Sequence, residues 1–309
     1  MIMSLLDRIV QPAEQLMQPP RGLEFDYSKP TGEPALISPD SISWHVFKNP
    51  VTLFIGGVAA VLLELAEPSV RSGVWNHSSF RSDPLTRLRR TGAAAMMTVY
   101  GPRSAAEAMI ARLVRIHGKV TGTTSDGTPY RANDPRLLDW VQATASFGFI
   151  EAYSRYARRL TQTEKSRAFA EGAPAARLYG ALNAPCSVED WSQMLDEFMA
   201  HLEPSPIIFE FLDIMRNTHI MAGLGPMQRL LVAAAVELLP DAARERLHLQ
   251  DHGLPWGTDT LVATIAKLAD RTPLRSAPPA QSSIRLGRPA TFLYSRRAGS
   301  RLTEPQDNS

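Results

Sequence analysis

The sequence has very little cysteine: Cys186 is the only one in 309 residues. A single cysteine forms neither a disulfide within the chain nor a cysteine zinc cluster, and chains without disulfides are typical of a reducing compartment. Cys186 lies in a predicted loop just before a helix, and no histidine is close to it in sequence. The pattern therefore does not favour a catalytic thiol.

Long apolar runs and strong net charge are also lacking. The longest apolar run, residues 51–68, contains Glu64 and is shorter than the roughly 20 residues that cross a bilayer as a helix. The first ten residues, MIMSLLDRIV, contain Asp7 and lack the apolar core of a signal peptide. A net charge of +2 does not indicate nucleic acid as a partner. We expect a cytoplasmic protein with no transmembrane segment, in which MIMSLLDRIV offers a weakly supported peripheral contact with a membrane.

Several common catalytic motifs are missing as well. The sequence contains no HExxH zinc motif, no GxGxxG after a predicted strand, no GxxxxGK[ST] phosphate loop and no GxSxG nucleophile elbow. These absences remove several common metalloprotease, dinucleotide-binding, nucleotide-hydrolysing and serine-hydrolase classes.

The hydrophobic periodicity predicts a mainly α protein with a single helical domain. We expect this domain to span residues 40–276 and to contain one small β-hairpin near residues 120–131, where Asp126-Gly127 separates two short β-favouring runs. Residues 1–39 are predicted to form a short helix and then an irregular arm. Residues 277–309 are rich in Pro, Ser, Arg and Gly, which predicts a mostly disordered tail.

A helix predicted to begin at Pro84 carries a polar face. Asp83 is a side-chain cap and Pro84 suits the first helical position. Arg87, Arg90 and Thr91 then follow at spacings of three and four, so they share one side of the helix. Such a face is either solvated or able to pair with the acidic groups of a cofactor or to polarise a bound ligand.

His117 lies near the end of the next predicted helix, residues 103–120. The helix is amphipathic, and Gly118 leaves room for a close approach to the imidazole. A neutral histidine on an apolar face is able to ligate a haem iron, although the pattern alone favours a satisfied core residue. Trp140 belongs to an aromatic stripe on the long helix that follows Pro135. By itself that stripe favours core packing over a cofactor wall.

Four segments together resemble a known family. They are LLELAEPSVRSGVWNHSSFRSDPLTRLRRT, RIHGKVTG, DGTPYRANDPRLLDWV and ARERLHLQDHGLPW, which occur in this order over residues 51–256. They resemble the DUF2236 family of MpaB-like oxygenases, which is related to the latex-clearing rubber oxygenases. The resemblance implies an all-α, globin-reminiscent fold that holds one b-type haem. It also implies activation of O₂ for oxidation or oxidative cleavage of a hydrophobic, lipid-like substrate, with an unidentified electron donor.

The resemblance also implies roles for individual residues. His117 matches the proximal iron ligand. Arg87, Arg90 and Thr91 match an Arg-x-x-Lys-Thr motif on the distal side, so they are the candidate catalytic residues, and Arg87 is also a candidate cofactor contact. Arg90 stands where a lysine caps the iron in relatives, and an arginine that stays protonated is a poor iron ligand. We therefore expect an open or water-bound sixth position, with Arg90 and Thr91 donating hydrogen bonds to bound oxygen.

The remaining candidate cofactor contacts are His77, Phe80, Arg81, Tyr130, Trp140 and Gln142. Two positions depart from the family. Gln142 and Glu67 stand where many members have histidine, and a glutamine does not shuttle protons near neutral pH. Glu67 is either a base, if buried, or a plain capping or surface glutamate.

Two other interpretations stay open. The chain is alternatively a non-catalytic haem protein, such as a gas or redox sensor or a carrier. It is also compatible with a helical interaction protein without a cofactor, in which His117 is a core residue.

Overall fold

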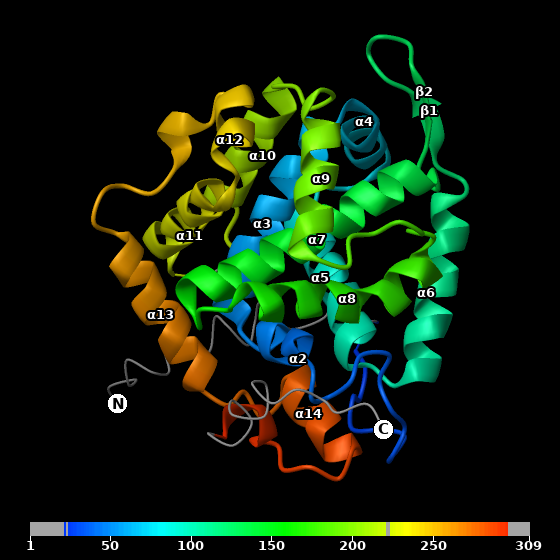
Figure 1. Ribbon diagram of the computed structural model, residues 1–309, viewed down its shortest axis with the longest axis vertical. Helices are drawn as coiled ribbons and strands as arrows, with labels where there is room; N and C mark the ends of the chain where they lie inside the picture. The colour runs from blue at the N-terminus through cyan, green and yellow to red at the C-terminus, as the bar shows by residue number, and fades with distance from the viewer. Residues whose placement is uncertain (1–21, 23, 221–222, 296–309) are drawn as a thin grey trace.

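The computed structural model describes residues 22, 24–220 and 223–295 and shows a mainly α protein with one antiparallel hairpin, as predicted (Figure 1). The elements are α2 (Ile42–Phe47), α3 (Pro50–Ala66), α4 (Pro68–His77), α5 (Pro84–Tyr100), α6 (Arg103–His117), β1 (Thr121–Thr123), β2 (Pro129–Arg131), α7 (Pro135–Tyr156), α8 (Gln162–Tyr179), α9 (Val188–Met199), α10 (Pro206–Asn217), α11 (Gly225–Leu238), α12 (Asp241–Arg246), η1 (Gln250–His252), α13 (Asp259–Arg271), α14 (Pro278–Arg285) and η2 (Phe292–Tyr294).

Local chemistry sets where several of these helices begin. Asn49, Asp83 and Asp134 each accept backbone N–H groups at a helix start, and each is followed by proline at the first helical position. A side-chain cap satisfies a backbone donor that has no partner within the helix, and proline has no N–H to leave unpaired. The capping residues and starts predicted for α5 and α7 are thereby confirmed.

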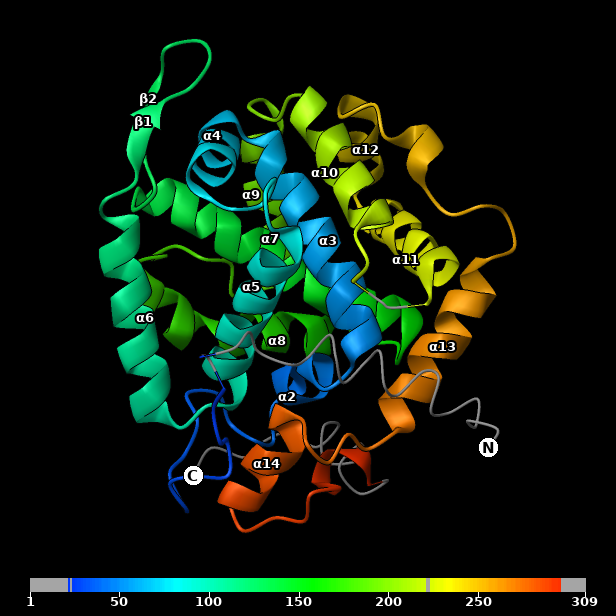
Figure 2. The same ribbon diagram turned by 180° about the vertical axis from the view of Figure 1, so that it is seen from behind.

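Helices α3 and α7 form the centre of the molecule (Figures 1 and 2). Two glycines allow their backbones to come close. A Cβ atom at Gly56 would lie 2.5 Å from the Gly148 carbonyl oxygen, and Gly148 is crowded in the same way by Gly56. The apolar run of α3 therefore packs on α7 on one side and on α10, α11 and α13 elsewhere.

The hairpin and α6 lie at one edge of this body (Figure 1). Strand β1 pairs with β2 in the register Gly122↔Tyr130, and the hairpin projects beyond the helices. It starts four residues after His117, so the last turn of α6 is tied to the hairpin base, where the Val120 N–H donates to the His117 carbonyl at 2.9 Å.

The predicted disordered tail is wrong for residues 277–295. Helix α14 packs against α5, and Arg285 is fully buried. Its guanidinium donates to the carbonyls of Tyr27, Glu33 and Tyr100 at 2.6, 2.9 and 2.7 Å. These acceptors are distant in sequence, so composition does not reveal them.

Residues 24–39 form no helix or strand and pack against the body through Tyr27, Ala35 and Ile37. The predicted N-terminal helix and the proposed membrane contact of MIMSLLDRIV lie outside the described residues, as do residues 296–309.

Among the described residues, no single helix is both long and apolar enough to cross a membrane. Only the bent pair α3 and α4, with an angle of 111° between the two helices, meets the length and composition criteria together.

Candidate active site

Four helices carry a stripe of side chains that stay accessible, although α3 and α7 lie at the centre of the molecule. The stripes are Leu53, Gly57, Val61 and Glu64 on α3; Arg87, Leu88, Thr91, Ala94, Ala95 and Thr98 on α5; Met109, Leu113 and His117 on α6; and Val141, Gln142, Ala145, Ser146 and Phe149 on α7. The spacing of three and four places each set on one helix face. Most members are small or apolar, and all but the exposed Thr91 are partly buried.

Contacts between the helices show that these faces are turned toward one another. A Cβ atom at Gly57 would lie 3.8 Å from the Phe149 ring, which joins the stripes of α3 and α7. The hydroxyls of Thr98 on α5 and Tyr179 on α8 are 3.0 Å apart. This hydrogen bond joins α8 to α5.

Glu64 is the ionisable group of the α3 stripe. It lies deep in the protein, yet the residue keeps some accessible surface. Burial raises the pKa of Glu64 from 4.5 to about 7, against the opposing effects of the positive charge on Arg87 and the Thr144 hydroxyl. The carboxyl group is therefore able to exchange a proton near neutral pH.

Arg87 brings a positive charge to the same place from α5. Its Nη1 donates to the Thr91 hydroxyl at 2.5 Å, one turn further along the helix. Burial lowers the pKa of Arg87, and Glu64 opposes this effect. Since arginine stays protonated in proteins, the residue supplies a fixed cation beside a carboxyl group that can titrate.

His117 ends α6 and is half-buried. Burial lowers its pKa, and the positive charge of Arg87 lowers it further. Both effects favour the neutral imidazole, which is the form that binds a metal. The Asn133 amide donates to the Val114 carbonyl at 3.1 Å and fixes the last turn of α6 to the segment before α7.

The three predicted catalytic residues are placed differently. Arg87 is coupled to His117 and Glu64. The Thr91 hydroxyl is held by Arg87, because it also donates to the Arg87 carbonyl at 3.0 Å. Arg90 is exposed, and its charge acts on Arg87 and Asp83. Arg87 therefore contacts Thr91 and interacts electrostatically with His117, whereas Arg90 and Thr91 are both exposed.

Helix α4 and the hairpin hold a second group of predicted residues. His77 Nε2 is 3.2 Å from the Tyr130 hydroxyl, so these two side chains join α4 to β2. Phe80 stacks on Trp75, and Arg81 forms two bonds of 2.7 and 2.9 Å with Glu210 on α10. In the described part of the chain, no hydrogen bond or ring contact links this group to His117.

Trp140 and Gln142 lie on different sides of α7. Trp140 is fully buried and stacks on Phe198 of α9 at 4.3 Å between ring centroids, which is the core packing that an aromatic stripe favours. Gln142 lies on the accessible stripe, where its amide donates to the Ser146 hydroxyl at 3.3 Å. It faces α8, since a Cβ atom at Gly172 would lie 3.7 Å from Gln142 Nε2.

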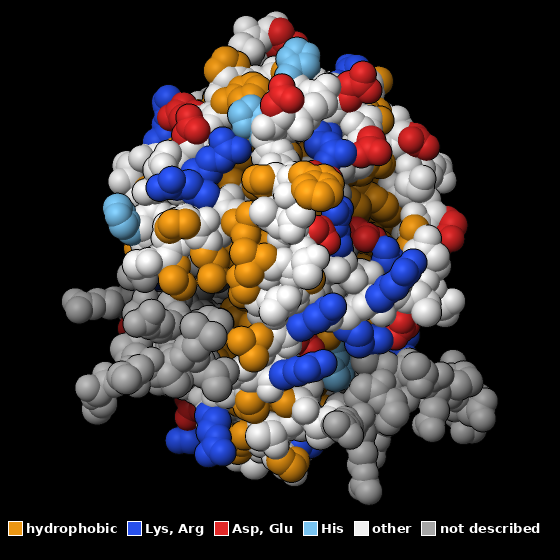
Figure 3. Space-filling view, turned by 90° about the vertical axis from the view of Figure 1, so that its left-hand side faces the viewer, with side chains coloured by type: hydrophobic (Ala, Val, Ile, Leu, Met, Phe, Trp, Pro, Cys, Tyr) orange, Lys and Arg blue, Asp and Glu red, His pale blue; other side chains and the backbone are white. Residues whose placement is uncertain are grey.

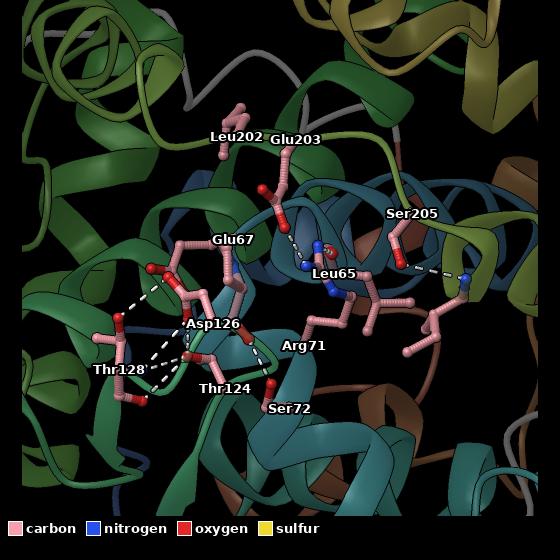
Figure 4. A network of polar contacts seen from close by, with 12 residues as sticks. Leu65, Glu67, Arg71, Ser72, Thr124, Asp126, Thr128, Leu202, Glu203 and Ser205 are labelled. Atoms are coloured by element: carbon pink, nitrogen blue, oxygen red, sulfur yellow. Dashed lines mark hydrogen bonds and ion pairs between the residues drawn. The ribbon is translucent and has the colours of Figure 1, made fainter.

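Glu67 is a capping residue. Its Oε2 accepts the Val70 N–H of α4 at 2.8 Å, and Oε1 lies 3.9 Å from the Arg136 guanidinium. Figure 4 shows it beside the ion pair between Arg71 and Glu203. This engagement fits the capping interpretation and leaves the role of buried base to Glu64, which sequence reasoning missed. The available signal was one carboxylate within the longest apolar run.

The side chains able to bind a metal decide which kind of metal site the protein could hold. In the part of the chain that the structure describes, no three His, Cys, Asp or Glu side chains come close enough to hold a metal ion. A metal held by side chains alone needs such a group, whereas a haem iron needs only one protein ligand. A single neutral histidine at an apolar-walled space therefore fits a haem.

A separate hollow of about 430 Å³ lies near the end of α7. It is lined by Glu151, Ser154, Arg155, Ala157, Arg159 and Lys267. None of the candidate residues contributes to it.

Comparison with known proteins identifies a family for the chain. Residues 44–271 match the family model described as the catalytic domain of the ER-bound oxygenase mpaB/B' and rubber oxygenase. No curated protein and no solved structure matches the chain. The matched residues cover well over half of the chain and contain Glu64, Arg87 and His117. The chain therefore belongs to the mpaB/rubber oxygenase family.

Proposed function

We propose that this protein is a b-type haem-dependent oxygenase that oxidises or cleaves a hydrophobic substrate with O₂, supplied with electrons by a separate donor where the reaction needs them. The observation that carries the proposal is the meeting of Glu64, Arg87 and His117. The three residues come from three helices, all three are partly buried, and the positive charge of Arg87 acts on both Glu64 and His117. The family match supports an oxygenase in general.

His117 would hold the haem iron, and the apolar stripes would contact the faces of the porphyrin. When bound, haem supplies an iron centre that binds and activates O₂. The low pKa of His117 favours the neutral form that ligation requires. Gln142 would contact the group from α7, where its amide is free to donate and accept hydrogen bonds but not to transfer a proton.

Arg87 would stabilise negative charge that develops in the pocket. A fixed cation in a site with little water interacts strongly with such charge, because the dielectric constant is low there. The hydrogen bond to Thr91 fixes the guanidinium in place. Arg90 would add a more distant positive charge from the outer side of α5.

Glu64 would accept a proton from the substrate. A general base works best when its pKa is near the working pH, and burial raises the pKa of Glu64 to about 7. An apolar substrate in this space would exclude water and leave Glu64 as the nearest acceptor on α3.

The group formed by His77, Phe80, Arg81 and Tyr130 would act by positioning. Tyr130 packs on α4, where a Cβ atom at Gly73 would lie 3.6 Å from its ring. The hairpin is thereby fixed to α4, and the end of α6 that carries His117 is tied to the hairpin. Trp140 would stabilise α7 by its core packing on Phe198.

The first test is an absorption spectrum of the purified protein from cells fed 5-aminolaevulinate, recorded before and after dithionite and CO. We expect a haem Soret band that shifts with CO. His117→Ala should lose the haem in a pyridine haemochrome assay, whereas His219→Ala, which changes an exposed histidine after α10, should keep it. Wild-type haem content in His117→Ala would refute the assignment of the ligand.

Turnover separates the oxygenase from a haem sensor or carrier. We expect O₂ consumption with an apolar alkene or lipid, and Glu64→Gln should keep the haem but lose most of this activity. Haem binding without O₂ consumption on any such substrate would favour the non-catalytic alternative.

A further inference from the structure

The outer face of α6 carries cations without a partner among the described residues. Arg112, Arg115 and Ile116 are exposed at spacings of three and four and share one face, and the exposed Lys119 follows in the turn after the helix. Within the described chain, the three cations form no ion pair and no side-chain hydrogen bond. Some other exposed cations are paired, for example Arg155 with Asp259 at 3.1 Å.

Neighbouring elements extend this surface. Arg131 stands opposite Thr121 at the base of the hairpin, a few residues after α6, and is exposed. Arg177, also exposed, lies in the last turn of α8, and this end of α8 reaches the side of α6 (Figures 1 and 2). We call the set the α6 surface: Arg112, Arg115, Ile116, Lys119, Arg131, Arg177, Leu178 and Leu182.

The α6 surface also exposes large apolar side chains. Ile116, Leu178 and Leu182 are 47%, 43% and 63% exposed. Cations interspersed with exposed aliphatic groups are typical of surfaces that enter the headgroup region of a bilayer. On the opposite side of the molecule, Figure 3 shows acidic, basic and hydrophobic side chains mixed.

We propose that the α6 surface binds an anionic lipid bilayer. The unpaired cations would pair with lipid phosphates and carboxylates, and the three aliphatic side chains would bury in the headgroup boundary. An acidic protein would satisfy the cations but gives no reason for the exposed aliphatic groups between them. The binding itself does not depend on haem or on turnover.

This placement has a consequence for the candidate active site. His117 is the last residue of α6 and follows Ile116 directly. The proposed iron ligand and the residues that would contact the bilayer therefore lie in the same two turns of the helix. A lipid-like substrate would then pass from the bilayer to the pocket over a short path beside α6.

The test is co-sedimentation of the purified full chain with vesicles of phosphatidylcholine alone or with about one-third phosphatidylglycerol, at low and high salt. Each cation near an anionic bilayer contributes about fivefold to binding. The triple variant Arg112→Glu/Arg115→Glu/Lys119→Glu should therefore lose about a hundredfold or more in the partition coefficient. Ile116→Ser/Leu182→Ser should weaken binding at both salt concentrations.

Matched controls are available in the same chain. Arg229, Arg271 and Arg275 are exposed and likewise unpaired among the described residues, and they lie on α11, α13 and the segment after α13. The triple change of these residues to Glu alters the net charge equally and should leave binding close to that of the wild type. Equal losses in both triple variants, or a wild type that ignores anionic vesicles and binds only an acidic protein, would overturn the proposal.

Discussion

Replacing Glu64 by Gln should stabilise the protein without haem at neutral and higher pH, but not at acidic pH. The pKa of this carboxyl is about 7 in the folded protein, against an ordinary value of 4.5. Below pH 4.5 the group is protonated in both the folded and the unfolded states, so it contributes no pH dependence. As the pH rises, the unfolded chain releases this proton first, and the folded state loses relative stability until the pH exceeds about 7.

The size of this effect follows from the two pKa values. A pKa difference of one unit between the folded and unfolded states corresponds to about 1.36 kcal/mol. The shift of Glu64 therefore changes the free energy of unfolding by about 3 kcal/mol. The glutamine side chain in Glu64→Gln has no such proton to release, so the variant does not lose this stability as the pH rises. The free energy of unfolding of the variant relative to the wild type should therefore rise by about 3 kcal/mol between pH 4 and pH 8.

The assay is urea unfolding of protein prepared without haem, followed by circular dichroism at several pH values. Glu107→Gln on the exposed side of α6 is the control for a change of charge alone. A second arm uses Arg87→Met. Because the Arg87 cation lowers the pKa of Glu64, its removal should move the transition to higher pH. A difference between Glu64→Gln and the wild type that stays constant with pH would refute the reasoning.

Three further predictions concern stability and are measured by the same unfolding assay. Gly148→Ala should lower the free energy of unfolding by about 1–3 kcal/mol, because its Cβ would clash with the Gly56 backbone. In the control Gly172→Ala the added Cβ makes only ordinary contacts, so the loss should be smaller. Equal effects of the two changes would contradict this account. Glu67→Ala should cost about 1 kcal/mol through loss of the α4 cap, and an unchanged midpoint would argue against a capping role. Arg285→Met should lower the free energy of unfolding by at least about 3 kcal/mol, since it leaves three carbonyl acceptors without their donors. The loss should exceed that of Arg288→Met, whose guanidinium is only partly buried. The reverse order would exclude the proposed anchoring of α14.

Much of the fold was predictable because its signals are local. The Asp–Pro pairs before α5 and α7 determine where those helices begin, and Asp126-Gly127 determines where the hairpin turns. The disorder predicted after residue 277 failed for the opposite reason. The bonds that hold α14 reach Tyr27 and Glu33, which no local composition reveals.

The candidate site also contains residues that local sequence signals predicted and one that they did not. Arg87 and Thr91 could be paired from their spacing on one helix, and the structure shows their hydrogen bond. The role of Glu64 could not be found in this way. Its raised pKa depends on burial among helices that are not adjacent in sequence, and a carboxylate in an apolar run is otherwise only evidence against a membrane span.

The sequence by itself determined the helical class, the starts of its principal helices, the family and the position of His117 at a helix end. These properties depend on capping, periodicity and motif order, which act within a few residues of the chain. Only the tertiary structure decided that Arg87 interacts with both Glu64 and His117, that Trp140 is core while Gln142 is only partly buried, and that the α6 cations have no partners among the described residues. Those properties depend on distances between helices, and such distances are set by packing of the whole domain.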